Sequence, residues 1–69
     1  MTREELVKNL GYLVEKYIVE NKKRHELLQE IARRDFYIAK GVLHEINKSP
    51  KPVEQADANL IKEISFNFA

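Results

Sequence analysis

Few residues in this chain of 69 have the types and spacing that catalysis or metal binding requires. The chain contains no cysteine, which excludes disulfides and zinc–thiolate sites. His25 and His44 lie far apart, and no His/His or Glu/His pair has the helical spacing of a metal site. Neither Ser49 nor Ser65 has a His–acid pair near it in sequence, and no glycine-rich phosphate loop is present. We therefore expect a non-enzymatic protein with no cofactor and no metal.

Asp35 is an acidic residue in the middle of an apolar helix face. At about 100° per residue, the segment 24–47 forms a single apolar stripe with Asp35 near its centre. The stripe consists of Leu28, Ile31, Ala32, Ile38, Ala39, Val42 and Ile46. A buried carboxylate is unfavourable unless it is paired or hydrogen-bonded. Asp35 therefore either pairs with a basic side chain such as Arg24, caps a new helix after Arg34, or faces a partner.

A dimer interface is the functional interpretation of this interruption. A polar residue within an apolar seam fixes the register of helix pairing at some expense of stability. We expect Asp35 to set the register of a homodimer, with Phe36 and Leu43 beside it in the seam.

Basic residues gather in the middle of the chain. Residues 1–21 hold 3 basic and 4 acidic side chains (net −1), residues 22–51 hold 8 and 4 (net +4), and residues 52–69 hold 1 and 3 (net −2). Such asymmetry marks either an anionic partner or neutralisation of the middle by the two ends. We favour neutralisation, because +4 is a small charge for a protein that binds nucleic acid.

The segment 29–34 resembles the opening of a helix-turn-helix motif, with Val42 at the apolar position of the second helix. It departs from the motif at Asp35 and Phe36, which occupy an apolar position and the glycine of the turn, and at Gly41 within the second helix. The resemblance implies, as an alternative function, a small DNA- or RNA-binding regulator. Its phosphate contacts would come from Lys22, Lys23, Arg24, Arg33, Arg34 and Lys40.

Apolar residues outside the core stripes are the candidates for protein binding. Tyr12 and Val19 lie on the outer side of the first predicted helix, and Tyr37 lies off the stripe of the second. Tyrosine is enriched among the residues that dominate binding energy at interfaces. We predict one binding patch formed by Tyr12, Val19, Tyr37, Phe66 and Phe68.

Three helices are predicted to position these residues. The first spans about 2–21: it begins with a Thr2-x-x-Glu5 capping box, carries Gly11 at a close helix contact, and ends at Asn21. A turn near 21–24 leads to a second helix over 24–47, although one continuous helix of about 46 residues is the alternative. A proline linker over 48–52 precedes a third helix over 53–65, for which Pro52 supplies the first residue.

These elements predict an all-α single domain, built from a long antiparallel helical hairpin and a short third helix. A chain this short has a marginal core, so we expect it to form a homodimeric helical bundle. No apolar run approaches a membrane span and the N-terminus lacks the pattern of a signal peptide, which indicates a cytoplasmic protein. The function we expect is that of a small regulatory or adaptor protein that binds a protein partner through its helix faces.

Overall fold

The computed structural model describes residues 1–33 and 38–68, and these residues form an all-α fold. Its helices are α1 (Arg3–Tyr17), α2 (Asn21–Ala32), α3 (Ile38–Lys48) and α4 (Gln55–Phe68). The predicted fold class is confirmed, but four helices replace the three that the sequence predicted.

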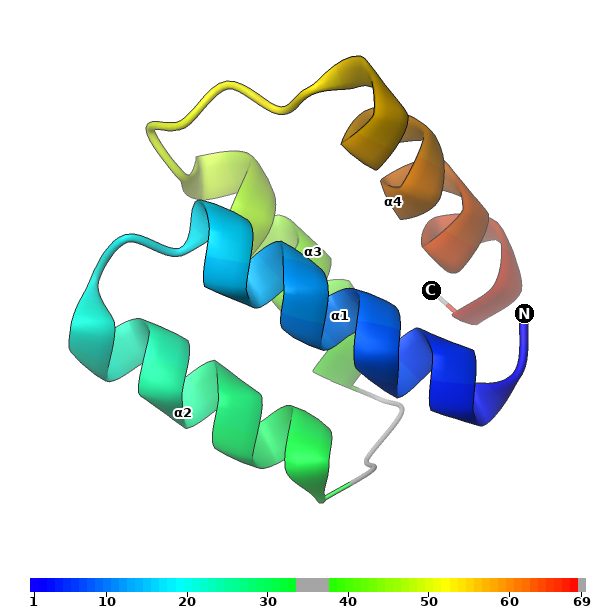
Figure 1. The fold of residues 1–69 in the computed structure, drawn as a ribbon, viewed down its shortest axis with the longest axis horizontal. Helices are drawn as coiled ribbons and strands as arrows, with labels where there is room; N and C mark the ends of the chain where they lie inside the picture. Colours follow the sequence, from blue (N-terminus) through cyan, green and yellow to red (C-terminus); the bar gives the residue numbers. More distant parts are fainter. Residues whose placement is uncertain (34–37, 69) are drawn as a thin grey trace.

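Helix α1 contacts each of the other three helices, and α3 contacts both α2 and α4 (Figure 1). The fold measures 27 × 27 × 15 Å, so it is thin along one axis. A single apolar core lies between the helices. It consists of Leu6, Leu10, Leu13, Val14, Tyr17, Ile18, Leu27, Ile31, Ala39, Val42, Leu43, Ile46 and Ile64.

The N-terminus of α1 has the predicted capping box. The Thr2 hydroxyl accepts a hydrogen bond from the Glu5 backbone N–H, and the Glu5 carboxylate accepts one from the Thr2 N–H. These bonds satisfy two of the donors that a helix leaves open at its start. The bond from the Thr2 N–H also holds the pKa of Glu5 below its usual value.

Helix α1 ends at Tyr17, four residues earlier than predicted. Ile18 is extended (φ −88°, ψ 106°) and buried in the core. The backbone carbonyls at this end accept hydrogen bonds from distant side chains: Lys51 Nζ reaches the Lys16 oxygen (2.8 Å), and Ser49 Oγ reaches the Tyr17 oxygen (2.5 Å). Asn21 begins α2 instead of capping α1. The helix therefore ends where other parts of the chain satisfy its carbonyls.

The predicted helix over 24–47 is wrong, because α2 ends at Ala32 and α3 begins at Ile38. The continuous helix of about 46 residues is excluded by the same boundaries. A straight 24-residue helix would be about 36 Å long, which exceeds the 27 Å extent of the molecule. Two shorter helices instead place the apolar residues of both halves in one core.

The replacement of one predicted helix by α2 and α3 bears on the residues predicted to form a dimer seam. Leu43 is buried in the core of its own chain, so it is not available to a second copy. Asp35 and Phe36 lie outside the described residues, as do Arg34 and Tyr37.

Helix α4 begins at Gln55, which leaves Pro52 outside the helix and corrects the predicted start. The Glu54 backbone N–H donates to the Tyr17 hydroxyl (3.0 Å), and the Glu54 carbonyl accepts from the Ala58 N–H. A contact with α1 therefore fixes the residue that precedes α4. The helix also continues to Phe68, three residues beyond the predicted end.

Gly11 and Gly41 lie within α1 and α3, and apart from its chain neighbours and its own helix backbone, a Cβ atom at either would meet no atom within 4 Å. The predicted close helix contact at Gly11 is therefore wrong.

Glycine in a helix interior is about 1 kcal/mol less favourable than alanine. We expect Gly11→Ala and Gly41→Ala each to raise the melting temperature by about 4–8 °C, as measured by circular dichroism. An unchanged or lower melting temperature would show that the open space at that position is needed.

Candidate functional site

Asp57, in the first turn of α4, is buried with 5% of its surface exposed, and no other charged side chain in the described residues is buried. Its carboxylate accepts hydrogen bonds from the Tyr12 hydroxyl (2.9 Å) and the Tyr17 hydroxyl (2.5 Å). It also forms an ion pair with Lys16 Nζ at 2.8 Å. All three partners lie on α1, so this carboxylate joins the start of α4 to the end of α1.

Lys16 completes what we call the Asp57 cluster, which consists of Asp57, Tyr12, Lys16, Tyr17 and Glu54. Its ammonium group contacts the Glu54 carboxylate and donates to the Tyr12 hydroxyl (3.1 Å). The same nitrogen lies 5.5 Å from the ring centroid of Tyr12 and 5.6 Å from that of Tyr17, within the range of cation–π attraction. Each polar group of the cluster thus has a partner of complementary charge or hydrogen-bonding type.

These contacts fix the protonation states of the cluster. The bonds from Lys16 and then from Tyr17 lower the pKa of Asp57 from 3.8 to about 2. Hydrogen bonds to Asp57, Glu54 and Tyr12 hold the pKa of Lys16 well above its usual value. Burial, together with the bond to Asp57, raises the pKa of Tyr17. A general acid or base works best with a pKa near the working pH. These shifts move the pKa values of all three groups further from neutral pH.

The cluster is therefore best suited to fastening α4 onto α1. Sequence reasoning missed it, although the signal was present. Asp57 precedes Leu60, Ile61 and Ile64 at helical spacing, so it interrupts an apolar stripe as Asp35 does. What the sequence lacked was any indication that Tyr12 and Tyr17 would face this carboxylate.

The low pKa of Asp57 predicts acid sensitivity. Above about pH 5, well above the unfolded-chain pKa of 3.8, the group is ionised in both the folded and the unfolded chain, and its stabilising contribution is complete. As the pH falls from about 5 toward 2, the unfolded chain takes up a proton that the folded chain does not, so the free energy of unfolding decreases. We expect urea midpoints measured between pH 5 and 2.5 to fall more steeply for the native chain than for Asp57→Asn. If the urea midpoints of the native chain and Asp57→Asn fell in parallel with pH, the low pKa of Asp57 would be contradicted.

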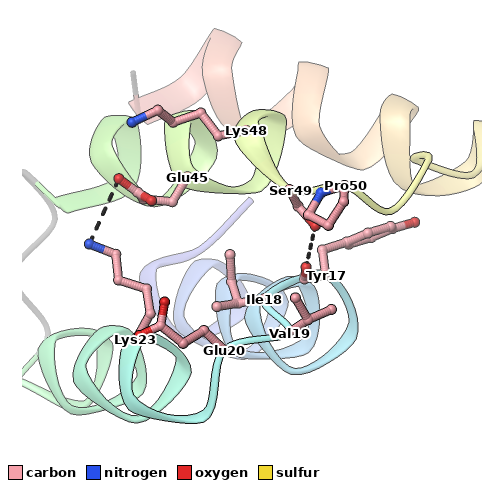
Figure 2. Close-up of a pocket in the computed structure, with 9 residues that line it drawn as sticks. All are labelled: Tyr17, Ile18, Val19, Glu20, Lys23, Glu45, Lys48, Ser49 and Pro50. Carbon is pink, nitrogen blue, oxygen red and sulfur yellow. Dashed lines mark hydrogen bonds and ion pairs between the residues drawn. The ribbon is translucent and has the colours of Figure 1, made fainter.

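A second feature is a pocket of about 160 Å³ beside the connection between α1 and α2. We call it the loop pocket; it is lined by residues 17–20, Lys23, Glu45 and residues 48–50. Figure 2 shows Ile18, Val19 and Pro50 toward one side of it, and the charged Lys23, Glu45 and Lys48 toward the other. Lys23 and Glu45 are paired across it at 3.8 Å. The pocket thus combines an apolar part with a charged rim.

Of the residues predicted to form a single protein-binding patch, those that the structure describes do not gather on one surface. Val19, 55% exposed, lines the loop pocket, whereas Phe66, 92% exposed, lies near the C-terminal end of α4 at the opposite side of the fold (Figure 1). Tyr12 is 45% exposed, but its hydroxyl is bonded to Asp57. Phe68 packs against the chain's own core.

Some of the basic side chains predicted to contact nucleic acid are engaged by other groups of the chain, and the others are spread over α2 and α3. Lys23 is paired with Glu45, and Arg24 donates to the Ile18 carbonyl (3.3 Å) and to the Asn21 side chain (2.5 Å). Lys22 and Arg33 are exposed at the two ends of α2, and Lys40 is exposed on α3. The described part of the chain therefore gives no specific support to the nucleic-acid alternative.

Comparisons with family models, curated proteins and solved structures find no match for this chain. None of the helices within residues 1–33 and 38–68 is long and apolar enough to cross a membrane. Over the same residues, no three His, Cys, Asp or Glu side chains gather as a metal site would need.

Proposed function

We propose that this chain is a small non-enzymatic adaptor or regulatory protein that binds a protein partner through the outward face of α4. The observation that supports this proposal is Phe66, a phenylalanine with 92% of its surface exposed. Phe66 is two residues from the buried Ile64, which places the two side chains about 200° apart around the helix. Phe66 therefore points away from the core.

The neighbours of Phe66 on this face are polar. Asn59, Lys62 and Glu63 precede it by seven, four and three residues, and all three are exposed. A single aromatic ring within a polar helix face has the form of an anchor that inserts into a partner's apolar groove. The ring does not stabilise the fold, and alanine has a better helix propensity at the same position. Binding gives this residue a role that folding does not.

The proposal is tested by a tagged pull-down from the source lysate, with and without nuclease, using the native chain, Phe66→Ala and Asn59→Ala. We expect a stoichiometric protein that survives nuclease and is lost with Phe66→Ala but retained with Asn59→Ala, the matched variant on the same face. Melting curves of both variants should equal or exceed that of the native chain. Equal capture by the native chain and Phe66→Ala would refute the role of this face, and loss of all capture on nuclease treatment would favour a nucleic-acid partner.

A further inference from the structure

The exposed Phe66 ring and the loop pocket match in size, and both present apolar surface. The loop pocket is open to solvent, and its volume of about 160 Å³ has room for a single aromatic ring. Its apolar lining includes Ile18, Val19 and Pro50. One phenyl ring is therefore a suitable occupant for it.

The charges around the two features are also complementary. Lys62 and Glu63 flank Phe66 on α4, and Glu20 and Lys48 lie on the rim of the loop pocket. None of these four side chains forms an ion pair within the described residues. A ring seated in the pocket can therefore bring Lys62 toward Glu20 and Glu63 toward Lys48. Such pairing selects a partner and an orientation more than it adds affinity.

The ring cannot occupy the pocket of its own chain. Phe66 lies at the C-terminal end of α4, and the loop pocket lies beside the connection between α1 and α2, at the other side of the molecule (Figure 1). Because the two features are on different surfaces, a contact between them has to join two molecules.

We propose that Phe66 of one copy inserts into the loop pocket of a second copy, so that the chain self-associates head to tail. This inference rests on the proposed function, in which Phe66 is a protein-binding anchor, and it names a second copy as the partner. It differs from the predicted dimer seam at Leu43, because it joins two different surfaces. Such a contact leaves one Phe66 and one loop pocket free at the ends, so assembly continues beyond the dimer unless a ring closes.

The test is sedimentation equilibrium of the purified chain from micromolar to millimolar concentration. A single aromatic anchor forms a small interface, so we expect weak association with a weight-average mass that rises past that of two chains. Phe66→Ala and Val19→Glu, each at an exposed side chain, should both weaken self-association at least tenfold. Asn59→Ala, on the same face as Phe66, should leave it unchanged.

A mixture of the two weakened variants distinguishes this arrangement from a symmetric one. Val19→Glu retains Phe66, and Phe66→Ala retains an intact pocket, so an equimolar mixture should recover association and level off at two chains. In a symmetric dimer, two Phe66 rings would pack against each other. Such a dimer would still form with Val19→Glu, and mixing the two variants would restore no association to Phe66→Ala. Either result would overturn the inference. A native chain that stays monomeric at millimolar concentration would also overturn it. If the lysate pull-down still depended on Phe66 in that case, the proposed function would stand with a different partner.

Discussion

Asp57→Ala is expected to lower the free energy of unfolding by about 3 kcal/mol, which corresponds to a fall of roughly 12 °C or more in melting temperature. The substitution removes the common partner of two tyrosine hydroxyls and one ammonium group. Removing one member of a buried ion pair typically destabilises by 3–5 kcal/mol. We place this case at the lower limit because the Lys16 side chain is 32% exposed and retains its contact with Glu54.

Urea unfolding followed by circular dichroism measures this effect, with two further variants for comparison. Asp57→Asn keeps an oxygen that can accept from a tyrosine hydroxyl but loses the charge, so it should fall between the native chain and Asp57→Ala. Glu63→Ala, on the exposed face of the same helix, should change stability by less than about 0.5 kcal/mol. A loss below about 1 kcal/mol for Asp57→Ala would mean that the cluster does not hold α4 in place.

Tyr17→Phe is expected to lower the melting temperature by about 5–10 °C, the second largest effect. The Tyr17 hydroxyl donates to Asp57 and also accepts from the Glu54 backbone N–H. Because the ring is buried, water cannot easily replace the lost hydroxyl, and both partners are left with one bond fewer. Thermal melting at neutral pH measures the change.

Tyr12→Phe is the matched control for this prediction. Tyr12 also donates to Asp57, but its side chain is 45% exposed, so water can take over the bond. We expect it to lower the melting temperature by less than half as much as Tyr17→Phe. Equal effects of the two substitutions would show that burial of Tyr17 does not strengthen its role.

Together the cluster and the exposed ring give α4 two separate roles. Its inner face is fastened at Asp57 and packed at Ile64, with Leu60, Ile61 and Phe68 half-buried against the core. Its outer face presents Phe66 among polar neighbours. Substitutions on the inner face are therefore expected to change stability, and substitution of Phe66 is expected to change binding.

Local sequence patterns were sufficient to predict features whose interacting residues lie close together in the sequence. The capping box at Thr2 and Glu5 is formed as predicted, because both of its partners lie within one helical turn. Helical periodicity correctly predicted an all-α fold, and it placed on one apolar stripe Ile31, Ala39, Val42 and Ile46, which all lie in the core. It also placed Val19 on the outer side of the first helix, and Val19 is exposed in the structure.

Tertiary contacts decided the features that periodicity could not. Helix α1 ends at Tyr17 because side chains from residues 49–51 bond to its last carbonyls, and α4 starts late because Tyr17 binds the Glu54 N–H. Asp57 and Tyr17 are 40 residues apart, so their contact has no local signature. Local patterns fix which residues are helical and apolar. Only the packing of the helices decides which buried charge finds its partners, and which apolar side chain is left for another molecule.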